Sequence, residues 1–212
     1  MPQWRSSRAP EVVDRPIGLP SDAGAVLLPL ARAAIGQELG DRPARGGAPD
    51  WLAHDWLAHP WLADPGASFV TLHTAGALSG CIGSLVPHRP LGSDVRDNAR
   101  AAAFRDPRFP ALTPAGLDDT VIDVSVLSAA TPLAVRSEAD ALARIRPGVD
   151  GLVLEYAGRR ATFLPQVWSE LPDPRDFLAR LKIKLGLPPT FWSDSLTLAR
   201  YTVTAFTEGE PS

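Results

Sequence analysis

Hydrophobic and polar residues alternate along the chain in two groups, and the first group lies in its middle third. Strict alternation over 68–74 predicts a β-strand, and an Ala-Gly turn leads into a second strand over 77–86. Apolar residues at helical spacing over 91–105 predict a helix, with Ser93 as its N-cap. The β-branched run over 120–127 predicts a third strand.

A second group of elements follows in the same order nearer the C-terminus. The runs 151–156 and 160–164 predict a hairpin across Ala157-Gly158. A helix comes next, with Asp173 as its N-cap and Gly186 as its stop. The alternating segment 198–206 predicts the last strand.

Both groups follow the order strand–strand–helix–strand, although we find no motif letters common to them, and this order indicates a structural duplication. Strands joined by short turns favour a largely antiparallel sheet, and segregated helices favour an α+β fold. The organisation that follows is an irregular lead-in over 1–20, one domain over 21–207 with a loop inserted at 41–66, and a tail over 208–212.

A further helix is expected before the first group. Ser21 or Asp22 is placed to cap it, and apolar residues at helical spacing follow. Pro29 lies inside this pattern and is expected to shorten, kink or delay the helix, because proline lacks the N–H that a helix interior uses. Gly40 is the expected stop.

The inserted loop contains a tandem pentapeptide, WLAHD-WLAHP-WLADP, that starts at Trp51, Trp56 and Trp61. A period of five matches neither a helix face nor a strand face, and three copies are too few for a solenoid. Two interpretations stay open: a duplicated loop whose tryptophans pack onto the body, or a partner-binding segment with exposed aromatic side chains. His54 and His59 are five residues apart, without a third ligand nearby, so this spacing does not indicate zinc.

Composition narrows the function classes. At 45% hydrophobic and 21% charged residues, the 212-residue chain has enough apolar material for a substantial core. The net charge of −3 argues against a dedicated nucleic-acid binder, and one cysteine excludes a disulfide scaffold. We expect neither a secretory leader nor a membrane span, and therefore a cytoplasmic protein. Separately, the sequence leads us to assign no cofactor and no metal.

Two glycines bracket the only thiol of the chain, in the run Gly80-Cys81-Ile82-Gly83. Glycine inside a strand marks a bulge or the close approach of another backbone or a ligand. This pattern suggests a strand that presents Cys81 at a concave spot. The alternative is that Cys81 is a small buried hydrophobic residue, which is the commonest environment of a free cysteine.

This stretch resembles the signature of the AMMECR-type domain family, which supplies protein A of the AmmeMemoRadiSam system. The resemblance covers about residues 22–207, in co-linear blocks. The matching blocks are 68–72, Gly76, 78–85, 94–95, 98–99, 102–109, 124–127, 147–152, 163–168, Lys184 and Gly186.

The resemblance implies an α+β fold of two unequal lobes around a cavity. It also implies, as partners, a Memo-like protein and a radical SAM protein, with no biochemical activity settled for the family. The sequence departs from the family pattern at Ser79, where relatives carry arginine. Serine cannot replace the bidentate donor of a guanidinium, so this departure puts an anion-binding role of this position in doubt. The tryptophan repeat looks like an expansion of a loop that is shorter in relatives.

An inward-facing polar pair supports a site near the thiol. Val121, Asp123 and Ser125 alternate along one strand and therefore share a face. An acid on a core strand needs a partner, and Arg108 would satisfy it as well as a ligand would. Arg105 and Arg108 flank Asp106-Pro107 at a helix end, where contact with the last carbonyls of the helix is favoured over anion binding.

Other candidates carry competing structural roles. His73 is the histidine nearest the thiol, although the family pattern does not require histidine there. Gln166 and Trp168 are interpreted either as packing, with the indole N–H paired in the core, or as a stacking wall for a planar ligand. Our candidate catalytic residues are Cys81 and Asp123, and our candidate ligand-binding residues are Ser79, Gly80, Gly83, Arg108, Ser125, Gln166 and Trp168.

Two functional hypotheses remain open. In the first, the protein is an enzyme or enzyme component that binds a small molecule in the cavity between the lobes, with Cys81 at its floor. In the second, it is a non-catalytic interaction module, in which Cys81 is packing and the tryptophan repeat recruits a partner.

Overall fold

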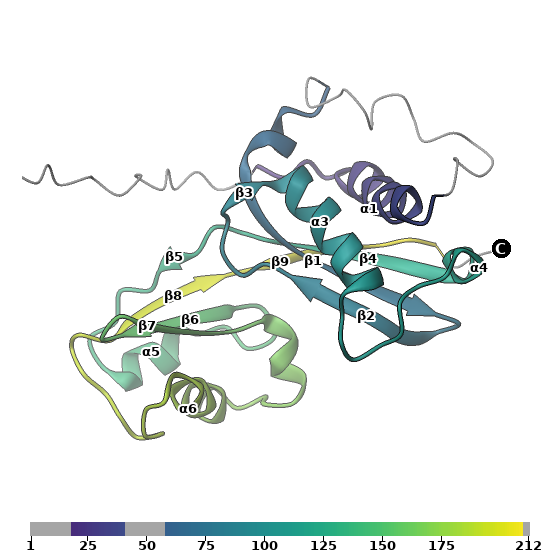
Figure 1. The fold of residues 1–212 in the computed structure, drawn as a ribbon. Coiled ribbons are helices and arrows are strands. Elements are labelled where there is room, and N and C mark those ends of the chain that lie inside the picture. Colours follow the sequence, from purple (N-terminus) through teal and green to yellow (C-terminus); the bar gives the residue numbers. More distant parts are fainter. Residues whose placement is uncertain (1–17, 41–57, 210–212) are drawn as a thin grey trace, which may run out of the picture.

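Two antiparallel sheets, each covered by helices on one face, make up the computed structural model, which describes residues 18–40 and 58–209 (Figure 1). The first sheet has the strand order β2-β1-β4-β9, and β3 pairs with β1. Helices α1 and α3 pack on one of its faces. The elements of this lobe are α1 (Gly24–Glu38), η1 (Pro60–Ala63), β1 (Pro65–Thr74), β2 (Ala77–Gly83), β3 (Arg89–Pro90), α3 (Leu91–Phe104), α4 (Pro114–Leu117), β4 (Thr120–Leu127) and β9 (Val203–Thr207).

The second sheet has the order β5-β8-β6-β7 and is backed by α6. Its core centres on Phe177, which is fully buried and stacks on the indole of Trp168 at 3.8 Å between ring centroids. The elements of this lobe are β5 (Thr131–Pro132), α5 (Glu138–Arg144), β6 (Gly151–Tyr156), β7 (Arg159–Phe163), η2 (Pro165–Ser169), α6 (Pro174–Leu185) and β8 (Thr197–Tyr201).

The alternating pattern of β1 explains how the first lobe divides its residues between two faces. Val70 and Leu72 are buried in the core that α1 and α3 form with the sheet. Because successive side chains of a strand point to opposite faces, Thr71 and His73 lie on the face without helices. Both of these polar side chains are partly exposed.

The two lobes repeat one arrangement, which confirms the predicted α+β fold with antiparallel sheets. The order strand–strand–helix–strand is realised as β1-β2-α3-β4 and as β6-β7-α6-β8. In both sheets the first strand of the group lies between the other two. Contrary to our prediction that the groups share no letters, both hairpins turn on Ala-Gly with positive φ at each residue, at Ala75-Gly76 and Ala157-Gly158.

Each group places its trailing strand in the other sheet. β5 follows β4 along the chain but pairs with β8, and β9 follows β8 but pairs with β4. The lobes meet in a small apolar cluster built from both sheets, which includes Ala67, Leu127, Val153 and Tyr201. The sheets are therefore joined both by packing and by two chain crossings.

Several predicted boundaries need correction. The predicted strand 198–206 divides at Thr202, where the chain passes from the second sheet to the first. Ser93 does not cap α3, which begins earlier with Pro90 at its N-cap. Neither Ser21 nor Asp22 caps α1, and that helix continues through Pro29 to Glu38.

Other local predictions are confirmed. Asp173 caps α6 by accepting a hydrogen bond from the N–H of Arg175, and Gly186 ends the helix with a φ of 83°. The strand predicted over 120–127 has these bounds in the structure. The short helix α5 was not predicted, and its first turn begins at Ser137, which accepts a hydrogen bond from the N–H of Asp140.

The third copy of the tryptophan repeat lies in the described part of the chain and forms η1. Leu62 is buried in the first core, and Trp61 packs partly buried against it. The packing interpretation therefore holds for this copy. Trp51, His54 and Trp56 lie outside the described residues.

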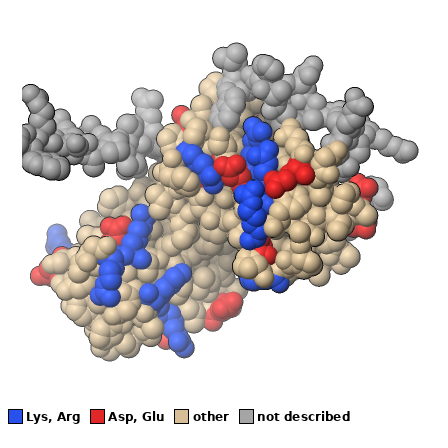
Figure 2. Space-filling model, in the orientation of Figure 1, with Lys and Arg blue, Asp and Glu red and all other residues tan. Residues whose placement is uncertain are grey.

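Charged side chains on the face shown in Figure 2 alternate in sign over α3. Two arginines of this lobe are paired with acids: Arg100 lies 3.7 Å from Glu38, and Arg89 lies 2.7 Å from Asp97. Among the residues that the structure describes, no helix is long and apolar enough to cross a membrane.

The fully buried Lys182 of α6 provides a test of the second lobe. Its Nζ donates to Glu138 of α5 at 2.7 Å and to the carbonyl of Pro189 at 3.1 Å. Glu138→Ala leaves a buried cation without its counterion, so we expect the free energy of unfolding to fall by about 3 kcal/mol. Lys182→Met removes the charge instead and should cost clearly less. Urea unfolding of both variants measures the difference, and an equal or larger loss for Lys182→Met would contradict this account.

Candidate functional site

A row of polar side chains crosses the helix-free face of the first sheet. In the strand register, Thr71 of β1 lies opposite Cys81 of β2 on one side and opposite Asp123 of β4 on the other. Directly paired residues of neighbouring antiparallel strands share a face. Cys81, Thr71 and Asp123 therefore form a continuous row across three strands, and the two predicted catalytic candidates lie two strands apart.

In this row, some hydrogen-bonding atoms of the polar side chains contact a neighbour and others do not. The hydroxyl of Thr71 donates to Sγ of Cys81 at 3.2 Å. His73, next on the same face of β1, places Nδ1 3.3 Å from Oδ2 of Asp123. The second oxygen, Oδ1, is buried and has no hydrogen-bond partner within residues 18–40 and 58–209. Cys81 itself is partly exposed.

The next row of the same face contains Ser125. It lies opposite Phe69, which in turn lies opposite Gly83. A Cβ at Gly83 would lie 2.2 Å from the Phe69 ring, so the glycine is needed to seat that ring. The hydroxyl of Ser125 has no hydrogen-bond partner in the described part of the chain, and the structure brings Ser125 onto the face of Cys81 and Asp123.

Gly80 has a different role, on the opposite face of β2. A Cβ there would lie 2.2 Å from the backbone carbonyl oxygen of Ala102 in α3. Only glycine lets this helix approach the strand so closely. The predicted bulge exists beside it, because the register between Leu72 and His73 of β1 skips Ser79.

Ser79 is separated from the thiol. Its hydroxyl lies 2.8 Å from that of Thr74, which lies 2.9 Å from that of the fully buried Thr120. Thr120 in turn donates to the carbonyl of Gly116. The hydroxyl of Ser79 therefore belongs to a chain that links three strands, and it forms no hydrogen bond with the row around Cys81.

Asp106 and Arg108 cover the open edge of β2 at Cys81. The Cys81 N–H donates to Oδ2 of Asp106 at 2.9 Å, and Arg108 donates to the Cys81 carbonyl at 3.0 Å. Arg108 also binds both carboxylate oxygens of Asp106, at 2.9 and 2.7 Å. These two side chains take the place of a neighbouring strand and fix the peptide that carries the thiol.

The ion pairs differ from those that the sequence suggested. Arg108 is the partner of Asp106 and not of Asp123, whose partner is His73. Arg105 lies 3.5 Å from Glu38 instead of binding helix carbonyls. The Arg108 guanidinium, together with the Cys81 N–H, holds the pKa of Asp106 well below its usual range.

The two candidates from η2 lie in the second lobe. Trp168 is buried, stacks on Phe177 and donates its indole N–H to the carbonyl of Asp150 at 2.7 Å. These contacts match the packing interpretation of Trp168. Gln166 is exposed and forms no side-chain hydrogen bond with the residues around Cys81.

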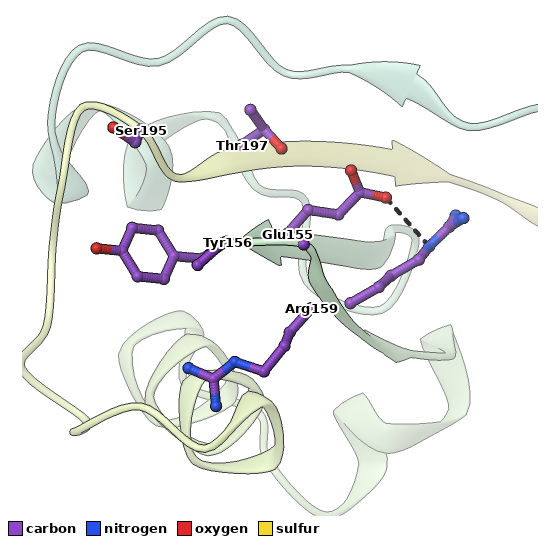
Figure 3. Close-up of a pocket in the computed structure, with 8 residues that line it drawn as sticks. Glu155, Tyr156, Arg159, Ser195 and Thr197 are labelled. Carbon is purple, nitrogen blue, oxygen red and sulfur yellow. Dashed lines mark ion pairs between the residues drawn. The ribbon is translucent and has the colours of Figure 1, made fainter. Parts of the chain in front are cut away.

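A pocket of about 420 Å³ lies at the end of the second sheet, away from the thiol (Figure 3). Glu155 and Arg160 line it and form an ion pair at 3.4 Å, whereas Arg159 points toward α6. Cys81 does not line this pocket. No group of three or more His, Cys, Asp or Glu side chains in the described ranges could hold a metal ion.

Sequence reasoning gave too little weight to three residues of this region. Alternation along β1 places Thr71 and His73 on one face, but the partner of each depends on which strands flank β1. Asp106 gives no periodic signal, because it follows the helix and contacts a strand 25 residues earlier. Its position beside Pro107, after a helix end, was the only available indication.

The fold and this row of residues define a duplicated α+β protein of two helix-backed antiparallel sheets. The model of the AMMECR1 family matches residues 28–206, and the chain belongs to this family. It is 40% identical to a Methanothermobacter thermautotrophicus protein over 181 residues, which are 84% of this chain and 90% of that one. A Methanocaldococcus jannaschii protein is 39% identical over 147 residues, or 68% and 73% of the two chains.

A solved structure is also similar. The crystal structure of an uncharacterised protein from Pyrococcus horikoshii matches with a TM-score of 0.67 and 32% sequence identity. The match covers 89% of this chain and 92% of that one. The fold is therefore shared by members of the family.

Gly80→Ala tests the contact between β2 and α3. The added methyl group meets a backbone carbonyl that cannot rotate away, so we expect a loss of about 3 kcal/mol in the free energy of unfolding. Gly18→Ala is the matched control, because a Cβ there has nothing within 4 Å. Urea unfolding compares the two variants. A Gly80→Ala variant as stable as the control would show that the helix does not constrain β2.

Asp106 makes stability depend on pH in a stated direction. Its pKa is lowered in the folded protein, so its contribution is complete above the unfolded value of about 3.9 and is lost as the pH falls toward the folded value. We expect Asp106→Asn to lower the urea midpoint at pH 7 and to lower it less at pH 3. Asp118→Asn, which removes an exposed carboxylate, should show no such pattern. A constant difference between pH 7 and pH 3 would refute this assignment.

Proposed function

We propose that the helix-free face of the first sheet is a small-molecule site in which Cys81 acts as the nucleophile or as the point of covalent attachment. The observation that carries this proposal is the shared face: the partly exposed thiol of Cys81 accepts a hydrogen bond from Thr71, and Asp123 and His73 lie on the same helix-free face. The buried Oδ1 of Asp123 has no hydrogen-bond partner among the described residues, so the surrounding fold does not fully satisfy this carboxylate.

The second lobe provides an internal comparison that supports this proposal. Aligning the two Ala-Gly turns makes Val153 the equivalent of Thr71. Its cross-strand partners are Thr162 and Ala199, where the first lobe has Cys81 and Asp123. Val153 and Ala199 lie in the apolar cluster that joins the lobes. The same scaffold position therefore serves packing in one lobe and carries ionisable groups in the other.

The contacts of the row suggest a division of labour. Thr71 donates its hydroxyl hydrogen to the sulfur, an arrangement that favours a sulfur acting as an acceptor and nucleophile. Nδ1 of His73 lies 3.3 Å from Oδ2 of Asp123, and Nε2 of that imidazole has no partner among the described residues. In this position His73 is suited to exchange a proton with a ligand that lies over the row.

The setting of this activity is also part of the proposal. We infer a cytoplasmic protein that works with a Memo-like protein and a radical SAM protein in a biosynthetic or modification pathway. This inference rests on the resemblance of the 68–85 and 102–109 blocks to the AMMECR-type protein A of such systems. The alternative is a non-catalytic interaction module, in which Cys81 is structural.

Complementation tests the proposal. In a strain that lacks the gene, we expect a pathway metabolite to accumulate, and the wild-type gene should remove it. With Cys81→Ser or Asp123→Asn, the strain should remove the metabolite at least about tenfold more slowly, because each substitution removes a group placed at the reacting centre. Glu170→Gln, which removes an exposed carboxylate of the second lobe, should restore metabolite levels.

Folding of each variant is confirmed by thermal unfolding before the comparison is made. Full restoration by both Cys81→Ser and Asp123→Asn would reject a chemical role for the row and leave the interaction module as the better account. Loss of co-purification with the two partner proteins in those variants would point to the same alternative.

A further inference from the structure

The guanidinium of Arg108 is only partly used by its contacts with the protein. Nε and Nη2 donate to the two carboxylate oxygens of Asp106, and Nη2 also donates to the carbonyl of Cys81. Cζ lies 5.2 Å from the ring centroid of Phe109. Within residues 18–40 and 58–209, Nη1 has no hydrogen-bond partner. The N–H groups of Nη1 are therefore available to a ligand.

The ion pair between Asp106 and Arg108 exposes its cation and buries its anion. The side chain of Arg108 is 56% exposed, whereas that of Asp106 is 2% exposed. Both oxygens of Asp106 already accept hydrogen bonds, from Arg108 and from the Cys81 N–H. A solute that approaches Cys81 along this edge of β2 therefore meets the guanidinium. Because the Coulomb energy falls with distance, the nearer cation outweighs the buried carboxylate.

This cation lies beside the thiol that the proposed function uses. The carbonyl to which Nη2 donates, at 3.0 Å, belongs to Cys81 itself. Asp106 raises the pKa of Arg108 most strongly, through a side-chain hydrogen bond, and Cys81 raises it further through its charge and a hydrogen bond. The competing charge is that of Asp123, which lies two strand spacings from Cys81, roughly 10 Å, where salt screens it.

We propose that the ligand of this face carries a carboxylate or a similar oxyanion, which binds Nη1 of Arg108 beside Cys81. This inference rests on the proposed function and adds the chemical class of the ligand. A guanidinium suits this task because its N–H groups match the geometry of an oxyanion. Binding of the anion at Arg108 places the rest of the ligand next to the sulfur.

Alkylation tests this proposal without knowledge of the natural ligand, because the chain has one cysteine and the reaction reports on Cys81 alone. The probes are iodoacetamide, which is neutral, and iodoacetate, which has nearly the same shape and carries a carboxylate. In both reactions the Cys81 thiolate forms a bond from sulfur to the methylene carbon, and iodide leaves. Each rate is divided by the rate with 2-mercaptoethanol, a neutral thiol, so that the intrinsic reactivities of the two reagents cancel.

We expect the corrected rate of iodoacetate to exceed that of iodoacetamide at least about threefold. Arg108→Gln should bring this ratio close to one, because the amide side chain has no charge. Arg105→Gln is the matched control. It removes an exposed arginine of the same segment that pairs with Glu38, and it should leave the ratio unchanged. A wild-type ratio near one, or a ratio that Arg108→Gln does not lower, would overturn the proposal.

Two further measurements cover a loss of stability in Arg108→Gln, which leaves the buried Asp106 carboxylate without its cation. The double variant Asp106→Asn/Arg108→Gln removes both charges, and its ratio should also lie close to one. In the wild-type protein the ratio should fall toward one as the salt concentration rises. If neither variant folds, the wild-type protein decides the matter, and a ratio that salt does not lower counts against the proposal.

The two adducts test the contact with Arg108 at equilibrium. They differ only in a carboxylate or a carboxamide, which one methylene group joins to the sulfur. The carboxymethyl adduct should unfold at a higher temperature than the carbamidomethyl adduct, because only the carboxylate forms an ion-paired hydrogen bond with the guanidinium. Equal unfolding temperatures in the wild-type protein would count against anion binding at Arg108 even if the rates differ.

The neutral reagent separates the two proposals. If iodoacetamide fails to modify Cys81 in the folded protein, the thiol is closed to solutes, and the proposed function fails together with this inference. If iodoacetamide reacts readily and iodoacetate shows no advantage, the site stands and only the ligand class is wrong.

Discussion

The close approach of α3 to β2 at Gly80 is the constraint on which the first lobe depends. Because the carbonyl of Ala102 occupies the place of a side chain, β2 can turn only a glycine toward the helix at this point. Alternation then directs the next residue, Cys81, to the opposite face. The segment that leaves α3 carries Asp106 back to the N–H of that same residue. The contact at Gly80 thus fixes both the position of α3 and the face of β2 on which the thiol lies.

The duplicated architecture explains why one polar row is informative. Both sheets offer a helix-free face of the same construction, and the lobes use part of it to pack against each other. In the second lobe the middle of the face is apolar and serves this junction. In the first lobe the equivalent positions carry a thiol and a carboxylate. These positions serve packing in the second lobe. In the first lobe they are not needed for packing, so we assign a chemical role to them.

Much of the fold follows from local sequence signals. The strands of both hairpins, the Ala-Gly turns and the boundaries of α6 depend on alternation, turn geometry and capping, which act over a few residues. The predictions that were wrong depend on distant parts of the chain. Thr202 divides the last strand because two sheets compete for it, and no local pattern records which sheet a residue joins.

The site was predictable to a similar extent. Alternation correctly placed Asp123 and Ser125 on one face, and the glycines around Cys81 correctly marked a close approach. Partners were not predictable, because an ion pair depends on which strands and loops become neighbours in space. Asp106 pairs with Arg108, and Asp123 lies beside His73, although the sequence analysis named Arg108 as one possible partner of Asp123.

The exchange of trailing strands has a consequence for how the molecule holds together. Each half of the chain completes its sheet with a strand from the other half, so neither half contains all of its own sheet. Separating the lobes would therefore strip an edge strand from each sheet, β9 from the first and β5 from the second.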